Sequence, residues 1–242
     1  MTDQYIGNSM TQSDEKSILT PPVYPLPSWS LLMPRKSRNP KHPESRANPG
    51  SSHAGGGQLR IIAGEWRSRK LPVANVPGLR PTSDRVRETV FNWLAMITPG
   101  AKVLDVFSGT GALSMEALSR GASSAVLLEK SPIAARTLKS NLALLKTERA
   151  KVIETDSLSW LNQPAGTGFD LIFLDPPFRM NLLETACQLL ESNGYLNENS
   201  RIYIEVEKEL TPLPVPENWQ LEKSKTAGQV SFSLWSRIKK QQ

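Results

Sequence analysis

Four consecutive residues, Asp175-Pro176-Pro177-Phe178, place an acidic side chain and an aromatic ring on either side of a stiff turn. They follow the apolar run from Phe169 to Leu174, which has the composition of a buried strand. Two successive prolines can neither continue a sheet ladder nor occupy a helix interior, so they fix the geometry between the carboxylate and the ring. Such a turn can hold a flat, polar group, although a lone motif of this kind is equally compatible with a plain strand-ending loop.

A second group of chemistry-bearing residues runs from Asp105 to Gly111. The sequence Asp-Val-Phe-Ser-Gly-Thr-Gly places a carboxylate at the end of an apolar strand and two glycines in the turn to a helix. Glycines there let the backbone approach a ligand closely, and the start of the helix presents free N–H groups. Ser114 stands where a dinucleotide-binding loop has its third glycine, which disfavours pyrophosphate as the ligand.

Carboxylates also end the next two predicted strands. Glu129 follows Gly109 by 20 residues, the spacing at which an acid accepts the hydroxyl groups of a ribose. Asp156 ends the following strand and can accept from an amino group such as that of adenine. The carboxyl ends of parallel strands form the binding crevice of an open α/β sheet, so these acids predict a nucleoside pocket without phosphate specificity. S-adenosylmethionine fits that pocket, because it carries ribose, adenine and a transferable methyl group but no phosphate.

With a methyl donor in this crevice, the four-residue turn acquires a chemical role. An exocyclic amine on a base or an amide is a poor nucleophile because its lone pair is delocalised. Hydrogen bonds from that amine to the Asp175 carboxylate and the Pro176 carbonyl favour the tetrahedral nitrogen that attacks a methyl group. Phe178 can stack on the ring and orient it. We therefore assign Asp175, Pro176 and Phe178 to catalysis, which requires no metal.

Positive charge is concentrated in one short stretch of the chain. The net charge is +6, and residues 58–87 contribute +5 of it, whereas residues 88–242 contribute −1. A local excess of cations around Trp66 favours a surface for a phosphate backbone, the alternative being a solvated basic face. The cations of this stretch are Arg60, Arg67, Arg69, Lys70, Arg80, Arg85 and Arg87.

The surrounding pattern predicts an α/β fold. Two short strands at 60–64 and 69–73 indicate a basic β-hairpin, and Thr82, Ser83 or Asp84 can cap the helix that follows. From residue 102 onward short apolar strands alternate with helices, which predicts a mostly parallel sheet covered on both faces. Segments 219–224 and 230–238 alternate by twos and join without a helix, as in an antiparallel hairpin. The outline is that of a Rossmann-like class I methyltransferase with seven strands and a small N-terminal hairpin.

The chain divides by composition into three parts. Residues 1–57 include eight prolines and a Gly triplet, so we expect a disordered extension. Residues 58–98 form the predicted basic hairpin and helix, and residues 99–242 the catalytic region. Both histidines lie in the first part, which excludes histidine-based catalysis and histidine metal sites from the rest. With a single cysteine, Cys187, and neither a membrane span nor a signal peptide in view, we expect a cytoplasmic protein.

Five segments together resemble the RsmD family of bacterial 16S rRNA guanine-N2 methyltransferases, and the likeness runs from about residue 58 to 238. They are Arg60–Gly64, Gly78–Leu94, Asp105–Gly111, Asp175–Phe178 and Ala227–Val230. The resemblance implies S-adenosylmethionine as cofactor and a guanine of 16S rRNA, within a 30S ribosomal particle, as target. The 57-residue leader departs from the compact family pattern. We further expect a monomer.

Besides the catalytic residues, we assign one group of residues to RNA binding and one to cofactor binding. The basic residues from Arg60 to Arg87 are assigned to RNA. The cofactor residues are Asp105, Phe107, Ser108, Gly109, Gly111, Glu129, Asp156 and Thr82.

Three alternatives remain open at this point. An amino methyltransferase acting on DNA or on a protein glutamine would use the same Asp-Pro-Pro-Phe turn. A nicotinamide-dependent oxidoreductase is disfavoured by Ser114 and leaves that turn without a role. A noncatalytic RNA-binding module would bind no cofactor.

Overall fold

The computed structural model describes residues 57–79 and 82–238. The prediction of a disordered leader concerns residues 1–57 and, apart from Gly57, lies outside the described residues. Arg80, one of the cations assigned to RNA, lies outside them as well. Over the described ranges, no helix combines the length and the apolar character needed to cross a lipid bilayer.

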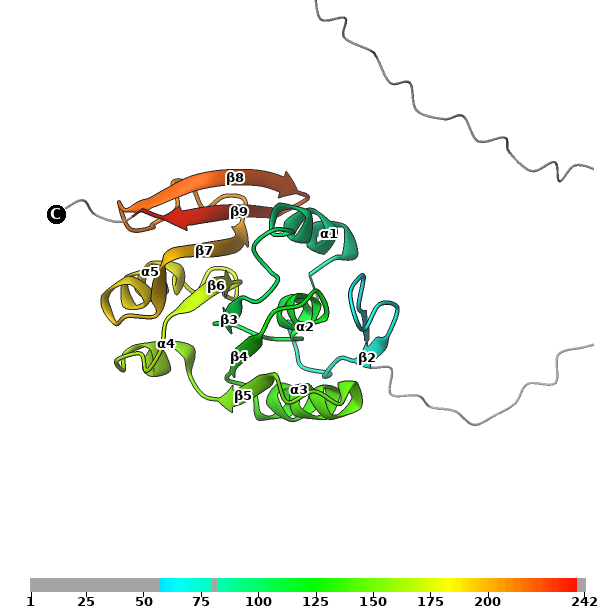
Figure 1. Ribbon diagram of the computed structural model, residues 1–242. Coiled ribbons are helices and arrows are strands. Elements are labelled where there is room, and N and C mark those ends of the chain that lie inside the picture. The colour runs from blue at the N-terminus through cyan, green and yellow to red at the C-terminus, as the bar shows by residue number, and fades with distance from the viewer. Residues whose placement is uncertain (1–56, 80–81, 239–242) are drawn as a thin grey trace, which may run out of the picture. The chain divides into compact units, whose positions relative to one another are not determined.

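Seven strands form one sheet in the order β5-β4-β3-β6-β7-β9-β8 (Figure 1). Strands β3 to β7 pair in parallel, and β9 pairs antiparallel with both β7 and β8. The predicted mostly parallel sheet with a C-terminal antiparallel hairpin is confirmed. The strands are β3 (Lys102–Asp105), β4 (Ser124–Glu129), β5 (Ala150–Glu154), β6 (Phe169–Leu174), β7 (Leu196–Glu207), β8 (Trp219–Ala227) and β9 (Val230–Arg237).

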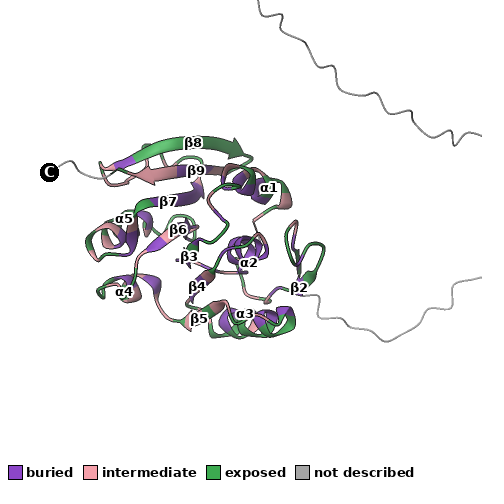
Figure 2. Cartoon of the chain, viewed as in Figure 1, coloured by how far each residue is buried: buried purple, intermediate pink, exposed green. Residues whose placement is uncertain are grey.

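Helices cover both faces of this sheet, as Figure 1 shows. They are α1 (Asp84–Trp93), α2 (Ala112–Ser119), α3 (Pro132–Leu145), α4 (Ser157–Leu161) and α5 (Leu183–Ser192). The first three share a buried cluster with Val103 and Phe173, whereas α4 and α5 pack against the opposite face, around Leu104 and Ile172. In Figure 2, α2 is buried throughout, whereas β8 is exposed over most of its length.

Local capping signals set two of the helix starts. The Ser131 hydroxyl accepts the Ala134 N–H, and Pro132 occupies the first turn of α3, where its missing N–H and fixed φ carry no penalty. Ser83 caps α1 in the same way. Helix α2 differs, because Gly111 occupies its N-cap in the left-handed conformation and has no side chain to cap it. The Asp105 carboxylate instead faces the backbone of Ser114 in the first turn of α2.

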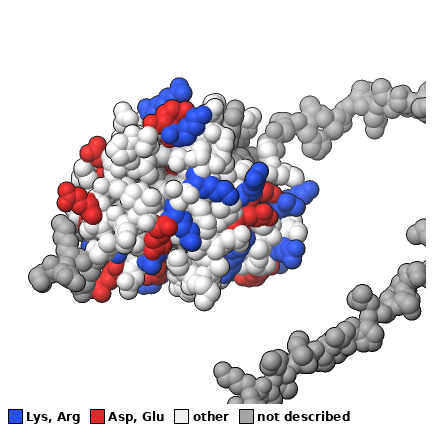
Figure 3. All heavy atoms as spheres, turned by 90° about the horizontal axis from the view of Figure 1, so that it is seen from above, with Lys and Arg blue, Asp and Glu red and all other residues white. Residues whose placement is uncertain are grey.

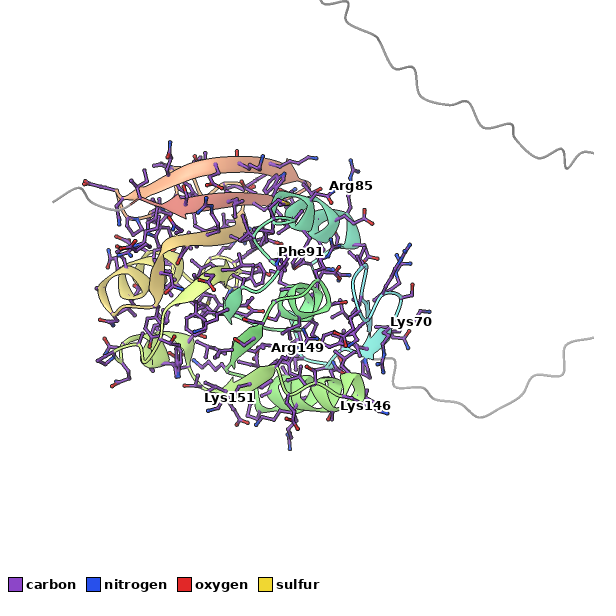
Figure 4. The ribbon with its side chains drawn as sticks, in the orientation of Figure 1. Lys70, Arg85, Phe91, Lys146, Arg149 and Lys151 are labelled. Carbon is purple, nitrogen blue, oxygen red and sulfur yellow. The ribbon has the colours of Figure 1, made fainter. Side chains whose placement is uncertain are left out.

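The predicted N-terminal hairpin is present as β1 (Gln58–Arg60) and β2 (Lys70–Pro72), which pair antiparallel. Its buried residues Leu59, Trp66 and Leu71 belong to the same cluster as α1, α2 and α3. The hairpin and the sheet therefore share one core. The guanidinium of Arg149, which directly precedes β5 (Figure 4), lies 5.2 Å from the centre of the Trp66 ring and adds a cation–π contact to the hairpin turn.

A buried ion network ties this hairpin to α2. Glu116 of α2 is fully buried, and its carboxylate accepts the N–H groups of Ile62 (2.8 Å) and Ala63 (3.0 Å). It also accepts from Arg87 Nη1 (3.3 Å) and Arg120 Nε (2.7 Å). Four donors thus satisfy one carboxylate that has no access to water, and they come from three separate parts of the chain.

This network corrects one sequence-based assignment. Arg87 was expected to contact RNA, but its side chain is only 1% exposed. Its guanidinium donates to Glu116, to Asp84 (2.6 Å) and to the Arg60 carbonyl (2.8 Å). Arg87 therefore holds α1, the hairpin and α2 together and presents no charge to a ligand.

Candidate active site

Three acidic side chains meet where neighbouring parallel strands end. In the sheet, β3 lies between β4 and β6, with Asp105 opposite Leu127 on one side and Phe173 on the other. Glu129 and Asp175 each lie two residues beyond those partners. All three carboxylates are therefore brought to the same edge of the sheet, as the sequence predicted, and that edge is where an open α/β sheet binds its ligands.

Glu129 is held in place by the backbone of the glycine loop. Its Oε2 accepts the Gly109 N–H at 2.8 Å, and its Oε1 accepts the Ser131 N–H at 2.6 Å. Burial raises the pKa of Glu129, and these backbone donors act in the opposite direction by favouring the carboxylate. Each oxygen retains a further lone pair, so this side chain can accept two hydroxyl groups of a ribose in a fixed orientation.

Both glycines of the loop have a positive φ, which favours glycine, and both leave little room for a side chain. Gly111 has φ +74°, and a Cβ atom there would lie 2.6 Å from Leu138 Cδ2. Gly109 has φ +52°, and a Cβ there would lie 3.0 Å from Leu79 Cδ1. The loop before α1 thus packs directly against the glycine loop, and Thr82, three residues beyond Leu79, follows in the same segment. The Thr82 carbonyl accepts from Arg87 Nε at 3.2 Å, and its contact with a cofactor stays a prediction.

Asp105 is buried at the floor of this crevice. Its Oδ2 accepts a hydrogen bond from the Ser114 hydroxyl at 2.6 Å. Burial raises the pKa of Asp105 to about 7, and the Ser114 hydrogen bond opposes part of that rise. Ser114, which the sequence marked only as a missing glycine, therefore orients an acid of the site.

The other loop residues assigned to the cofactor have internal partners. The Ser108 hydroxyl donates to the Asp105 carbonyl (3.1 Å), and its N–H donates to the Leu128 carbonyl (3.0 Å). Phe107 is half-buried against the core below α4 and α5. These residues shape the loop, and their direct contact with a ligand stays a prediction.

Asp156 lies at the end of β5 and caps α4. Its Oδ1 accepts the Ser159 N–H at 3.0 Å, and its Oδ2 accepts from Lys130 Nζ at 3.1 Å. The Ser159 N–H and the Lys130 ammonium lower the pKa of Asp156, so it is ionised at neutral pH. The expected acceptor for an adenine amino group is thus present at the expected strand end, with part of its hydrogen-bonding capacity already used.

Glu205 of β7 lies next to the Asp175 turn, and sequence reasoning did not identify it as a site residue. Leu174 pairs with Ile204 in the parallel register of β6 and β7, so Asp175 and Glu205 follow side by side on the same face. Burial raises the pKa of Asp175, and the neighbouring charges of Glu205 and Asp105 raise it further. The Tyr203 hydroxyl donates to Glu205 Oε2 at 2.6 Å. Glu205 lies within β7 rather than after its end, so the rule that found the acids at strand ends did not find it.

The rest of the turn has the exposure that its predicted role needs. Pro176 is buried and Pro177 is exposed, and the Phe178 ring is 43% exposed. The backbone after it is held to β7 by a hydrogen bond from the Arg179 N–H to Glu207 Oε1 at 3.1 Å. An aromatic ring is therefore presented to solvent three residues beyond Asp175, where a planar group can stack on it.

Most of the remaining cations assigned to RNA are exposed. Arg60 pairs with Asp84 at 2.9 Å, and Arg69 donates to the Leu144 carbonyl at 2.8 Å. Arg67, Lys70 and Arg85 form no ion pair within residues 57–79 and 82–238, and Figure 4 shows the last two extending from β2 and α1. In Figure 3, Lys and Arg predominate on the side of α1 and the hairpin.

Comparison with known proteins identifies relatives over most of the described chain. The family described as Conserved hypothetical protein 95 matches residues 59–236. The chain is 50% identical over 186 residues to the ribosomal RNA small subunit methyltransferase D of Escherichia coli K12, covering 77% of this chain and 93% of that protein. It is 52% identical over 182 residues to the protein of the same name from Haemophilus influenzae, covering 74% of this chain and 94% of that one.

A solved structure supports the same relationship. An Escherichia coli protein described as a candidate methyltransferase superposes with a TM-score of 0.71 and 47% identity, covering 76% of this chain and all of that one. The crevice fits the methyl donor of such a fold, S-adenosylmethionine, because Glu129 can hold a ribose while no cation in the glycine loop calls for phosphate. The chain belongs to the ribosomal RNA small subunit methyltransferase D family, the RsmD family.

Proposed function

We propose that this protein transfers a methyl group from S-adenosylmethionine to the exocyclic N2 amine of a guanine in 16S rRNA, within an assembled or partly assembled 30S particle. The observation that carries the proposal is the Asp175-Pro176-Pro177-Phe178 turn at the strand edge that also presents Glu129. The names of the relatives support an rRNA substrate. The target atom rests on the chemistry of the turn.

The cofactor supplies a methyl group activated by a sulfonium; the residues of the turn supply the orientation. Asp175 and the Pro176 carbonyl accept the two hydrogens of the amine, which localises the nitrogen lone pair toward the methyl carbon. The nitrogen lone pair forms the new N–C bond as the C–S bond breaks, and the electron pair of the C–S bond stays on sulfur. The amine then loses a proton to Asp175 or to water. Phe178 stacks on the base and keeps the nitrogen in line with the breaking bond.

A stacked guanine hides its N2 amine, so the base must leave its stack to reach Asp175. Enzymes that act on bases commonly extrude the target nucleotide into a pocket and hold the flanking backbone. The exposed cations Arg67, Lys70 and Arg85 supply such contacts from the hairpin and α1. Phosphate contacts of this kind give affinity and position, whereas the pocket around Asp175 selects the amine.

The main rival is an amino methyltransferase that acts on DNA or on a protein glutamine. Labelled S-adenosylmethionine should be offered with 30S particles, naked 16S rRNA, duplex DNA and bulk protein in parallel. We expect label in the 30S reaction, recovered as N2-methylguanine after nuclease digestion and mass analysis. Label that appears only in DNA or in protein would overturn the proposal.

The acid beside Asp175 predicts a pH dependence. Asp175 must be ionised to accept the amine, and its raised pKa keeps it protonated to higher pH than an ordinary aspartate. The rate should therefore fall as the pH is lowered, and the fall should begin at a higher pH than for an ordinary aspartate. Glu205→Gln removes a neighbouring negative charge and lowers the pKa of Asp175, so the acid limb of the profile should move to lower pH.

Single-turnover rates across a pH series measure this effect. Glu217→Gln, which neutralises an exposed acid far from the turn, is the matched control and should keep the wild-type profile. An identical acid limb in Glu205→Gln and wild type would show that the two carboxyl groups are not coupled.

A further inference from the structure

A cavity of about 310 Å³ lies between α1 and the β8–β9 hairpin. Arg85 and Thr89 line it from α1, and Lys225 and Phe232 line it from the hairpin. Its volume is at the small end of the range of about 300–1,000 Å³ that is usual for small-ligand sites.

The register of the sheet relates this cavity to the catalytic turn. Lys225 pairs with Phe232, and Phe232 pairs with Glu205, which is the neighbour of Asp175. Paired residues of adjacent strands point to the same face, so these four side chains form one row on the face that α1 covers. Three strand spacings, roughly 14 Å, separate the backbone of Asp175 from that of Lys225.

The charges in the cavity are uncompensated. Arg85 and Lys225 form no ion pair with any residue that the structure describes, in contrast to Arg60 and Arg87, which pair with Asp84. Phe232 is buried and gives the cavity an apolar floor. Two cations above an apolar floor suit a phosphodiester and its sugar better than a neutral ligand, because a guanidinium and an ammonium can both donate hydrogen bonds to the oxygens of one anionic phosphate.

We propose that this cavity holds a phosphodiester of an RNA nucleotide that flanks the methylated base. The inference rests on the proposed function and deepens it: β8 and β9 become a second RNA-contacting element, opposite the N-terminal hairpin. Backbone held between Arg85 and Lys225 anchors the strand on the same sheet face as Asp175. The anchor opposes the return of the extruded base to its stack.

Charge-neutralising variants test the cavity directly. Arg85→Gln, Lys225→Gln and the double variant are compared with Lys139→Gln, a matched control on α3, which packs at the other end of the sheet where β5 lies. Each single cavity variant should raise KM for 30S particles about three- to tenfold, which corresponds to one lost charge contact. The affinity for S-adenosylhomocysteine should stay near wild type, because neither residue is among the groups that hold the glycine loop or Glu129.

Salt dependence supplies a second readout that needs no methyl transfer. Binding of the S-adenosylhomocysteine complex to 16S rRNA is measured over a salt series. A plot of log affinity against log salt has a negative slope, and its magnitude should decrease by roughly 0.7 for each neutralised contact to single-stranded RNA. Thermal melting checks that each variant is folded.

The outcomes separate this proposal from the proposed function. Slopes and KM values for Lys225→Gln that match those of Lys139→Gln would overturn the cavity proposal while wild-type methylation stands. Absence of N2-methylguanine with the wild-type enzyme would instead overturn the proposed function, and the salt series would still decide whether the cavity binds RNA.

Discussion

Asp175→Asn is expected to lower the rate of methyl transfer by about 10²–10³-fold or more, the usual cost of removing one well-placed hydrogen-bonding group that acts in the transition state. The substituted amide keeps one acceptor oxygen but carries no negative charge and places an NH2 donor where the carboxylate has its second acceptor. The carboxyl side chain is not among the groups that hold the glycine loop or Glu129. Affinity for S-adenosylhomocysteine, measured by calorimetric titration, should therefore stay close to wild type.

Stability measurements make this result interpretable. The pKa of Asp175 is raised in the folded protein, so its ionised form destabilises the fold at pH values above that pKa. An amide in its place carries no charge beside Glu205 and Asp105, so the variant should melt at the same temperature as wild type or higher. An inactive variant that is at least as stable separates the chemical role from a structural one, and Asp175→Ala provides a second test. Near-normal turnover in either variant would contradict the mechanism.

Glu116→Ala is expected to destabilise the protein by about 3–5 kcal/mol, the range for removing one partner of a buried ion pair. The substitution leaves the buried Arg87 guanidinium with only Asp84 as an acidic partner, and it leaves the N–H groups of Ile62 and Ala63 without their acceptor. In a domain of this size the melting temperature should fall by about 6–20 °C. Chemical denaturation at neutral pH measures the free energy of unfolding directly.

Glu88→Ala is the matched control for this experiment. Glu88 lies on α1 one residue from Arg87 but is exposed, so its substitution should change stability by no more than about 0.5 kcal/mol. If the free energy of unfolding of Glu116→Ala also differed from wild type by no more than about 0.5 kcal/mol, the buried network would contribute no net stability. Because the network joins the hairpin to α2, protection of the Ile62 and Ala63 amides from hydrogen exchange should be lost in Glu116→Ala and kept in the control.

Features that depend on nearby residues were predictable from the sequence. Helix α3 begins at Pro132 after the Ser131 cap and ends at Leu145, as the capping signals indicated. The turn at Gly109 and Gly111 and the carboxylates that end β3 and β4 were likewise found, because strand ends and glycine turns leave local marks. The mostly parallel pairing of the strands followed from their alternation with helices.

Features that depend on distant residues were not predictable in the same way. Arg87 looked like one more cation of a basic stretch, and its burial is caused by Glu116, which lies 29 residues away in the sequence. Only residues 202–206 have the apolar sequence of a strand, yet β7 extends over Leu196–Glu207, because its polar first half also pairs with a neighbouring strand. The coupling of Glu205 to Asp175 likewise required the register between β6 and β7.

The strand order leaves β5 and β8 as the outermost strands of the sheet. An open edge offers unpaired N–H and C=O groups to any other extended chain, and lysine on edge strands is a common protection against such pairing. Exposed Lys223 and Lys225 lie on β8, and Lys151 lies on β5 (Figure 4). The lysine that we assign to RNA thus also discourages two copies of the protein from joining their sheets edge to edge. Selection for solubility and selection for substrate binding then favour the same charge.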